Sequence, residues 1–183
     1  ITFSLAGEEM CRTKYGDENS YKSAATLNMI NWNNIADYAD VVSYYKGMIQ
    51  IKSHFTPFTC DDLTYADAYT FNSLPAIPTD KLAFTVANDQ PGEWSKIAVI
   101  YNGSAKAADV TLKDTSVTDW VIIANDETAG LENLGEVTGS TFTVDARSAL
   151  IAVEKSSFEA ASYESNMGKV KVNYVYEDGT PLE

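Results

Sequence analysis

Short runs of β-forming residues, separated by turn residues, make up most of the chain between residues 81 and 155. The runs are rich in Val, Ile, Phe and Thr, and they cover 81–88, 96–102, 108–114, 119–125, 140–145 and 148–155. Turn-forming pairs such as Asn102-Gly103 and Asn125-Asp126 lie between them. Strands of this length and spacing predict a mainly β fold, namely an antiparallel β-sandwich.

The stretch Glu136–Val144 carries a more specific turn signal, the pair Gly139-Ser140. Gly139 can adopt the positive φ angle that the first central position of a type II′ turn requires. We therefore expect the residues on either side of this pair to form a hairpin with a two-residue loop.

The N-terminal part has a different pattern, with a helical period over residues 37–53. Apolar side chains recur there at spacings of three and four, at Val41, Tyr44, Met48, Ile51 and Phe55. Gly47 weakens the helix by about 1 kcal/mol relative to Ala, and Pro57 marks its end. Residues 1–6 predict a short buried strand. One strand and one amphipathic helix cannot bury both faces, so we expect this helix to pack on the sandwich or on a second copy.

These patterns divide the chain into three parts, 1–58, 59–155 and 156–183. The third part begins with a linker rich in Ser, Ala and Glu. An alternating run over 169–177 then predicts a strand entering a hairpin at Asp178-Gly179. Its pairing partners would lie beyond residue 183, and the chain begins at Ile1 rather than Met. We therefore expect a piece of a longer polypeptide, in which a further module follows.

Charge narrows the range of partners. The chain has 13 Lys and Arg against 26 Asp and Glu, a formal net charge of −13. Nucleic acids and anionic membranes need a basic face, so neither is expected as a partner. No apolar run approaches the roughly 18 residues of a membrane span. Cys11 and Cys60 lack metal-site spacing, and the sequence leaves open whether they pair.

Residues 7–21 gather the densest set of hydrogen-bonding side chains, including Glu8 and Glu9. The two carboxylates of a glycoside hydrolase face each other at about 5–9 Å. Adjacent residues that leave a strand point to opposite sides, so Glu8 and Glu9 are expected to support the loop structurally. Trp94, after Pro91-Gly92, is a candidate sugar platform. No loop motif for a metal ion is present, and no metal or other cofactor is expected.

Four segments carry a resemblance to a known family: Gly7-Glu8-Glu9, Arg12-Thr13-Lys14, Asn19-Ser20-Tyr21 and Asn28–Trp32. With the helix that follows, they resemble the end of the catalytic domain of pullulanases, the α-1,6-glucan debranching enzymes of the α-amylase superfamily (glycoside hydrolase family 13). The resemblance extends over residues 1–58. It departs at Asn31, where the family commonly has Asp, and at Cys11, where it commonly has an aliphatic residue or Phe.

The resemblance implies a place for each part of the chain. Residues 1–6 would be the eighth strand of a (β/α)8 barrel, residues 7–33 the loop after it, and the helix would pack on the outside. That loop would help to bind an α-glucan such as pullulan, amylopectin or glycogen. Asn19 is the first candidate contact, Arg12 the next and Tyr21 the third; alternatively, Arg12 braces Glu8 or Glu9.

The resemblance also implies what lies elsewhere. The catalytic residues of the family follow earlier barrel strands, so this chain is expected to be inactive without an upstream catalytic barrel. The β-region is similar to the C-terminal sandwich domain of the superfamily, and the tail is similar to the start of a mucin-binding-type repeat, which favours a secreted or bacterial surface protein. Two alternatives remain: an independent carbohydrate-binding module, with Trp94 or a β-face as platform, and a surface-adhesion β-module.

Overall fold

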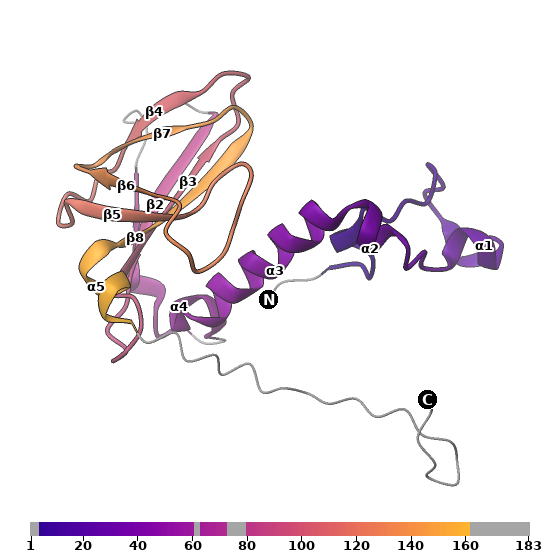
Figure 1. Ribbon diagram of the computed structural model, residues 1–183, viewed down its shortest axis with the longest axis horizontal. Coiled ribbons are helices and arrows are strands. Elements are labelled where there is room, and N and C mark those ends of the chain that lie inside the picture. Colours follow the sequence, from indigo (N-terminus) through magenta and orange to yellow (C-terminus); the bar gives the residue numbers. More distant parts are fainter. Residues whose placement is uncertain (1–3, 61–62, 73–79, 162–183) are drawn as a thin grey trace, which may run out of the picture.

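Two antiparallel sheets form the centre of the structure, a computed structural model that describes residues 4–60, 63–72 and 80–161. The larger sheet has the strand order β1-β2-β3-β8-β5-β6, and the smaller one pairs β4 with β7. The bounds of the strands are β1 Tyr69–Phe71, β2 Lys81–Ala87, β3 Lys96–Asn102, β4 Ala108–Thr111, β5 Asp119–Ala124, β6 Gly135–Thr138, β7 Thr141–Val144 and β8 Ser148–Glu154. The predicted antiparallel β-sandwich is confirmed (Figure 1).

The larger sheet is buried on both faces, and the two-residue period of its strands shows how. On β3, Ile97 and Val99 face a core cluster shared with the helices. Ala98 and Ile100 alternate with them and face a second cluster shared with the smaller sheet. Successive side chains of a strand point to opposite faces, so a central strand covered on both sides is apolar throughout. The run of apolar residues in β3 is therefore a consequence of the three-layer arrangement.

The predicted N-terminal helix is confirmed as α3, Ala39–Ser53. Short helical segments surround it: η1 Glu8–Met10, η2 Ser20–Lys22, α1 Ala25–Asn28, α2 Asn34–Asp37, α4 Thr56–Thr59 and η3 Ala66–Ala68. Ile51 and Phe55 are buried in the same cluster as the sheet residues Val99 and Ile151. The apolar stripe of the helix thus packs on the sandwich, as expected.

Gly47 explains how the helix comes so close to the sheet layer. A Cβ atom at this position would lie 1.8 Å from the main-chain oxygen of Ala129, in the loop between β5 and β6. One turn earlier, the Tyr44 hydroxyl donates a hydrogen bond of 2.9 Å to the Asn125 carbonyl in the same loop. The glycine that weakens the helix locally therefore permits its contact with the sandwich.

The hairpin predicted at Gly139-Ser140 is wrong. Gly139 does have a positive φ of 97°, but β6 pairs with β5 in the larger sheet and β7 pairs with β4 in the smaller one. The turn connects the two sheets. Its two residues bond to separate neighbours, because the Gly139 amide donates to the Thr118 carbonyl and the Ser140 carbonyl accepts from the Leu112 amide.

The structure describes only part of the two chain ends, where the sequence predicted a strand over 1–6 and a linker and strand after residue 155. Residues 155–160, where the sequence predicted the start of a linker, form α5 (Lys155–Ala160) instead, and Phe158 packs against the core. The predicted strand over 169–177 lies outside the described residues, as does the first half of the predicted strand 1–6; Ser4 and Leu5 are irregular. Within the described ranges, no helix combines the length and apolarity needed to cross a membrane.

Candidate functional site

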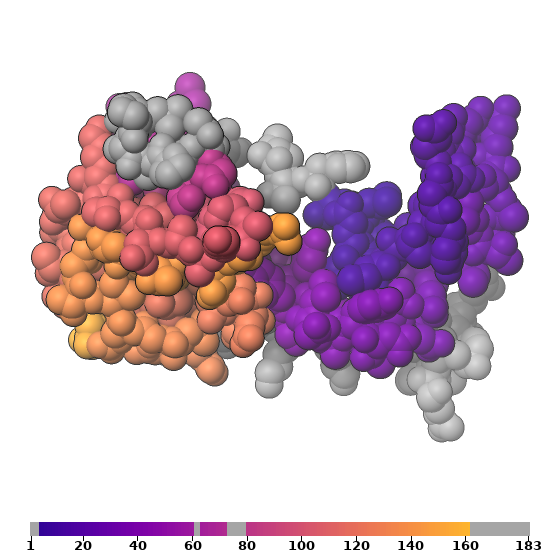
Figure 2. Space-filling view, turned by 90° about the horizontal axis from the view of Figure 1, so that it is seen from above, coloured from indigo at the N-terminus to yellow at the C-terminus, as the bar shows by residue number. Residues whose placement is uncertain are grey.

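Residues 7–33 form an irregular segment, referred to below as the N-terminal loop, at the N-terminal end of α3. Its only regular pieces are η1, η2 and α1, each three or four residues long. Figure 1 shows it at the end of α3 that points away from the sheets, and in Figure 2 it stands as a separate lobe beside them. The loop is held to the molecule by α2 and by η1, which packs against α3.

Arg12 closes the loop onto its own beginning. Its Nη1 donates a hydrogen bond of 2.9 Å to the Ala6 carbonyl, and its Nη2 donates to the Asn28 carbonyl, sixteen residues later. Gly7, at φ 98°, lies directly beneath this side chain, because a Cβ there would be 2.7 Å from Arg12 Cδ. A guanidinium with donors in a fixed fork suits this bridging of two main-chain carbonyls. Arg12 therefore positions the loop.

Asn28 is a residue that holds the loop together and that sequence reasoning missed. Its side-chain amide donates to the carbonyls of Ser20 (2.7 Å) and Ser23 (3.3 Å), while its side-chain oxygen accepts from Lys14. With the Arg12 bond to its main chain, Asn28 connects two separate stretches of the loop, 12–14 and 20–23. The only signal was its place at the start of the Asn28–Trp32 motif, since nothing in its own residue type distinguishes it.

Glu8 and Glu9 differ in what they contact. Glu9 Oε2 accepts a hydrogen bond of 3.0 Å from the Gly7 amide, within the left-handed turn that opens the loop. The Glu8 side chain is exposed and makes no hydrogen bond or ion pair with a residue that the structure describes. Arg12 contacts neither carboxylate among its hydrogen bonds, so the alternative in which it braces them is not the arrangement observed.

Asn19 and Tyr21 lie on the solvent side of the loop. Tyr21 is 73% exposed, with the Lys22 ammonium 5.3 Å from its ring centroid. The main-chain amide of Asn19 donates to Asp17, but its side-chain amide has no hydrogen-bond partner among the described residues. Hydrogen bonds from the Ser23 hydroxyl and then from the Asn19 amide lower the pKa of Asp17 below its ordinary value. Asp17 thus fixes the backbone that presents Asn19 to solvent.

The tryptophan chosen as a sugar platform is corrected by the structure. Trp94 is 1% exposed and belongs to the core cluster beneath α3 and α4, so neither face of its indole is open to a ligand. Trp32, in the N-terminal loop, is 65% exposed. Trp120 is buried against Phe142, with ring centroids 5.9 Å apart.

The N-terminal loop does not enclose a site by itself. The hollow beside Arg12, Tyr15 and Met29 has a volume of about 120 Å³, whereas small-molecule sites usually occupy about 300–1,000 Å³. Among the described residues, no group of three or more His, Cys, Asp or Glu side chains is arranged to hold a metal ion. Cys11 and Cys60 are not joined by a disulfide. The loop can therefore supply hydrogen bonds and aromatic faces to one side of a ligand.

An apolar groove lies along α3 and reaches Phe58 of α4 and Ile151 of β8, and the name "outer groove" is kept for it here. It has a volume of about 450 Å³ and is lined by Ser4, Tyr45, Met48, Ile49 and Phe58 among others. Ile49 is 61% exposed. Ser4 belongs to the segment predicted as a barrel strand, so this apolar face is on the side of α3 where that strand ends.

Comparisons with known proteins agree with this arrangement of loop, helix and sandwich. A pullulanase structure from Bacillus acidopullulyticus superposes with a TM-score of 0.70 and 31% identity, covering 80% of this chain and 18% of that one. A pullulanase from Anoxybacillus sp. LM18-11, complexed with maltotetraose, gives 0.66 and 23% over 84% of this chain and 21% of that one. At that identity the second likeness shows the fold alone.

A sequence comparison gives the same family. A curated pullulanase of Bacillus subtilis (strain 168) is 27% identical over 105 residues, which are 57% of this chain and 14% of that protein. No family model matches the chain. The chain spans between 14% and 21% of the length of these relatives. The resemblance to pullulanases that the loop motifs predicted is confirmed.

Proposed function

We propose that this chain, which is of the pullulanase type, is the non-catalytic C-terminal part of a secreted glycoside hydrolase that cleaves α-1,6 bonds of α-glucans. One observation carries the proposal. A pullulanase structure matches 80% of this chain at 31% identity, yet the match accounts for 18% of that protein's length. In this interpretation the catalytic residues, and the upstream barrel that holds them, belong to the remainder of the polypeptide.

The surface of the N-terminal part supports the proposal that another part of the polypeptide covers it. The outer groove is apolar, and Ile49 projects into it although more than half of its side chain is exposed. Exposed contiguous apolar surface on a soluble protein marks a place that another surface covers. We assign this role to the upstream barrel, which the predicted strand 1–6 and α3 would complete.

The proposed substrate contact comes from the loop. Asn19 offers an unoccupied side-chain amide two residues before the exposed ring of Tyr21. The backbone between these two residues is fixed at the Ser20 carbonyl by Asn28, which Arg12 holds in turn. An amide can donate to one sugar hydroxyl and accept from another. The hollow at the loop is too small for a sugar, so we propose that the loop forms one wall of a site whose other walls are on the barrel.

The test is reducing-sugar release from pullulan by two proteins. One is the 183-residue chain, and the other is the same chain extended upstream by one barrel length, about 250 residues. We expect activity only from the extended protein. In that protein Asn19→Ala should lower kcat/KM about tenfold, while Glu18→Ala, its neighbour, should leave it unchanged. Activity of the short chain alone would contradict the proposal.

The adhesion alternative depends on residues 162–183, which lie outside the described residues, and it stays a prediction. Secretion and location at the bacterial surface are likewise part of the proposal, together with the division of the chain at residues 58 and 155. The contacts of Ile51 and Phe55 with the sheet cross the first of these boundaries. An extended protein cut at residue 58 should for this reason lose stability as well as its sandwich.

A further inference from the structure

A second groove, which we call the tyrosine groove, lies between α3 and the end of the larger sheet where β3 finishes and β8 begins. Its main hollow has a volume of about 530 Å³ and is lined by Tyr44 of α3, Tyr101 of β3, Asp126 of the β5–β6 loop, and Arg147. A neighbouring hollow of about 520 Å³ shares Tyr44 and Asp126 and adds Tyr45. No residue of the N-terminal loop lines either hollow.

Aromatic side chains form one wall of the tyrosine groove. Tyr101 follows Val99 on the helix-facing side of β3 and is 46% exposed, because α3 no longer covers the sheet there. Tyr44 is half-buried, and its hydroxyl is fixed on the Asn125 carbonyl at 2.9 Å. Burial raises the pKa of Tyr44, and the nearby groups Asp126 and Tyr101 raise it further.

Unpaired charged groups stand around these rings. Neither Asp126 nor Arg147 forms an ion pair with a residue that the structure describes. Glu127 and Asp40 add two further carboxylates in the neighbouring hollow. Carboxylates accept hydrogen bonds, and a guanidinium donates several in one plane. The groove therefore presents acceptors and donors to the same ligand, with aromatic faces between them.

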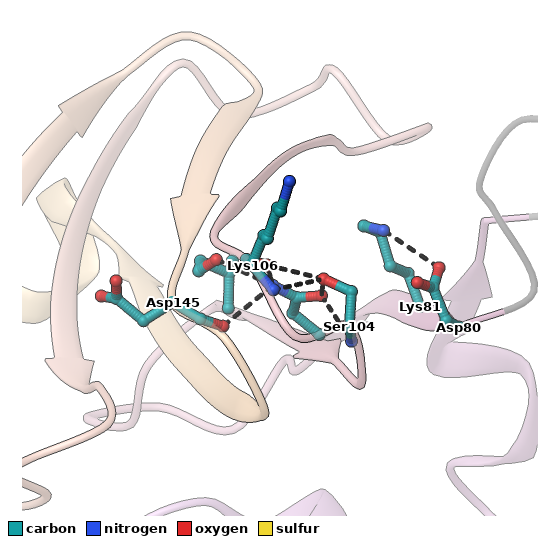
Figure 3. Close-up of polar contacts among 7 residues, drawn as sticks. Asp80, Lys81, Ser104, Lys106 and Asp145 are labelled. Atoms are coloured by element: carbon teal, nitrogen blue, oxygen red, sulfur yellow. Dashed lines mark hydrogen bonds and ion pairs between the residues drawn. The ribbon is translucent and has the colours of Figure 1, made fainter.

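The end of the groove that carries Arg147 is built rigidly. Asn102 is buried, and its side-chain amide lies within 2.9–3.0 Å of the carbonyls of Lys106, Val144 and Asp145. Its side-chain oxygen accepts from the amide and hydroxyl of Ser104, whose carbonyl accepts from the Arg147 amide at 3.0 Å. Figure 3 shows Ser104, Lys106 and Asp145 converging on this point. Two turns are thus locked together, and Arg147 is held at a φ of 53°.

We propose that the tyrosine groove binds an α-linked gluco-oligosaccharide, as a second contact to a polymeric substrate. The volume is in the range of small-molecule sites, and aromatic walls with a few polar groups are their usual lining. Carboxylates and a guanidinium can accept from and donate to the hydroxyls of a neutral ligand, and three carboxylates against one guanidinium disfavour an anion. The choice of glucan rests on the proposed function. A second contact on the same polymer raises the effective concentration of the first.

The experiment is titration of the 183-residue chain with maltoheptaose, followed by NMR chemical shifts. We expect saturable shifts at residues of the tyrosine groove with a Kd on the order of 1 mM. Tyr101→Ala should weaken binding about tenfold. Arg147→Asn should do the same, since it removes the guanidinium and Asn tolerates a positive φ. Leu82→Ala is the matched control. Leu82 pairs with Tyr101 across the strands and is 42% exposed, but it does not line the groove.

Two results would overturn this site: no shifts at about 10 mM sugar, tenfold above that Kd, or shifts that persist in both groove variants. Its failure and the failure of the proposed function are distinguishable. Binding at the groove with no pullulan hydrolysis by the extended protein would reject the enzyme and keep the site. Hydrolysis by the extended protein with no groove binding would reject the site and keep the enzyme.

Discussion

At the scale of single residues, Asp114 shows how hydrogen bonds stabilise a carboxylate on the sandwich. Lys96 donates to its Oδ2 at 2.6 Å, Thr85 donates to the same oxygen at 3.1 Å, and Ser116 donates to Oδ1 through both its amide and its hydroxyl. Burial alone would raise the pKa of Asp114, but these hydrogen bonds outweigh burial and hold the pKa well below its ordinary value. The carboxylate therefore joins β2, β3 and the segment after β4.

We expect Asp114→Asn to lower the free energy of unfolding by about 1–3 kcal/mol at pH 7, the range for hydrogen bonds to a charged group. The pKa is lower in the folded than in the unfolded chain, where it is about 3.9. The contribution is therefore complete above that pH and is lost as the pH falls toward the folded pKa. Denaturant unfolding at pH 7 and at pH 3 measures the difference between variant and original chain.

That difference should be constant from pH 7 to 5 and should narrow below about pH 4. Asp89→Asn, which changes an exposed carboxylate on the loop between β2 and β3, is the control. Its unfolding free energy should stay within about 0.5 kcal/mol of the original chain at every pH. A difference that widens in acid would show that Asp114 does not titrate as its contacts require.

Residue identity alone did not decide which tryptophan is exposed. Trp94 follows a Pro-Gly turn and was a candidate platform, yet it is buried because α3 and α4 cover it. Trp32 belongs to a segment without a periodic pattern, and its ring is open to solvent. Burial of a large side chain depends on which distant element lies above it, and a local sequence window does not contain that information.

At the scale of elements, the contact between α3 and the sandwich depends on the missing side chain at Gly47. Gly47→Ala should raise the local helix propensity by about 1 kcal/mol. The new methyl group would overlap the Ala129 carbonyl, which is main chain and cannot move aside as a flexible side chain would. We expect a net loss of about 1–3 kcal/mol in the free energy of unfolding, the usual cost of overpacking.

Thermal unfolding measures this loss, and Lys46→Ala is the control because its side chain is exposed on the same turn. An equal or higher melting temperature for Gly47→Ala would mean that α3 does not approach the β5–β6 loop as closely as described. The helix itself was predictable from its period. From the sequence, Gly47 was expected only to destabilise the helix. Its contact with the β5–β6 loop was not predictable, because that loop is about 80 residues away in the sequence, as the Tyr44–Asn125 bond shows.

The connection between β6 and β7 gives a second example at this scale. A glycine with positive φ was correctly expected at residue 139. The local pattern is the same whether a turn closes a hairpin or leads from one sheet to another. Pairing with β5 and β4 decides between the two, and those partners are set by the packing of the whole sandwich.

At the scale of the whole molecule, the outer groove should matter only when the upstream part is present. Ile49→Glu places a charge on an exposed position of the 183-residue chain, so its unfolding free energy should change by no more than about 0.5 kcal/mol. In the protein extended upstream, the same charge would be buried without a partner. We expect the free energy of unfolding to fall by about 3 kcal/mol or more in the extended protein. We also expect its hydrolysis of pullulan to be lost.

The melting temperatures of the Ile49→Glu variant and of the original sequence, compared in the short and in the extended protein, measure this effect. Lys52→Gln, on the rim of the same groove, is the control, because it also changes the charge by −1 but places no carboxylate on the apolar face. Equal effects of Ile49→Glu in the short and the extended protein would contradict the assignment of this face to the barrel.

The sequence by itself determined most strands of the sandwich, although not β1, together with the extent of α3 and the resemblance to pullulanases. Strand and helix periods are local properties, and the loop motifs are short enough to be read directly. Only the tertiary structure decided that Arg12 and Asn28 hold the loop, that Trp94 is buried and that Tyr44, Tyr101 and Arg147 share a groove. Each of these depends on contacts between residues far apart in the chain, and such contacts are selected by the packing of the complete fold.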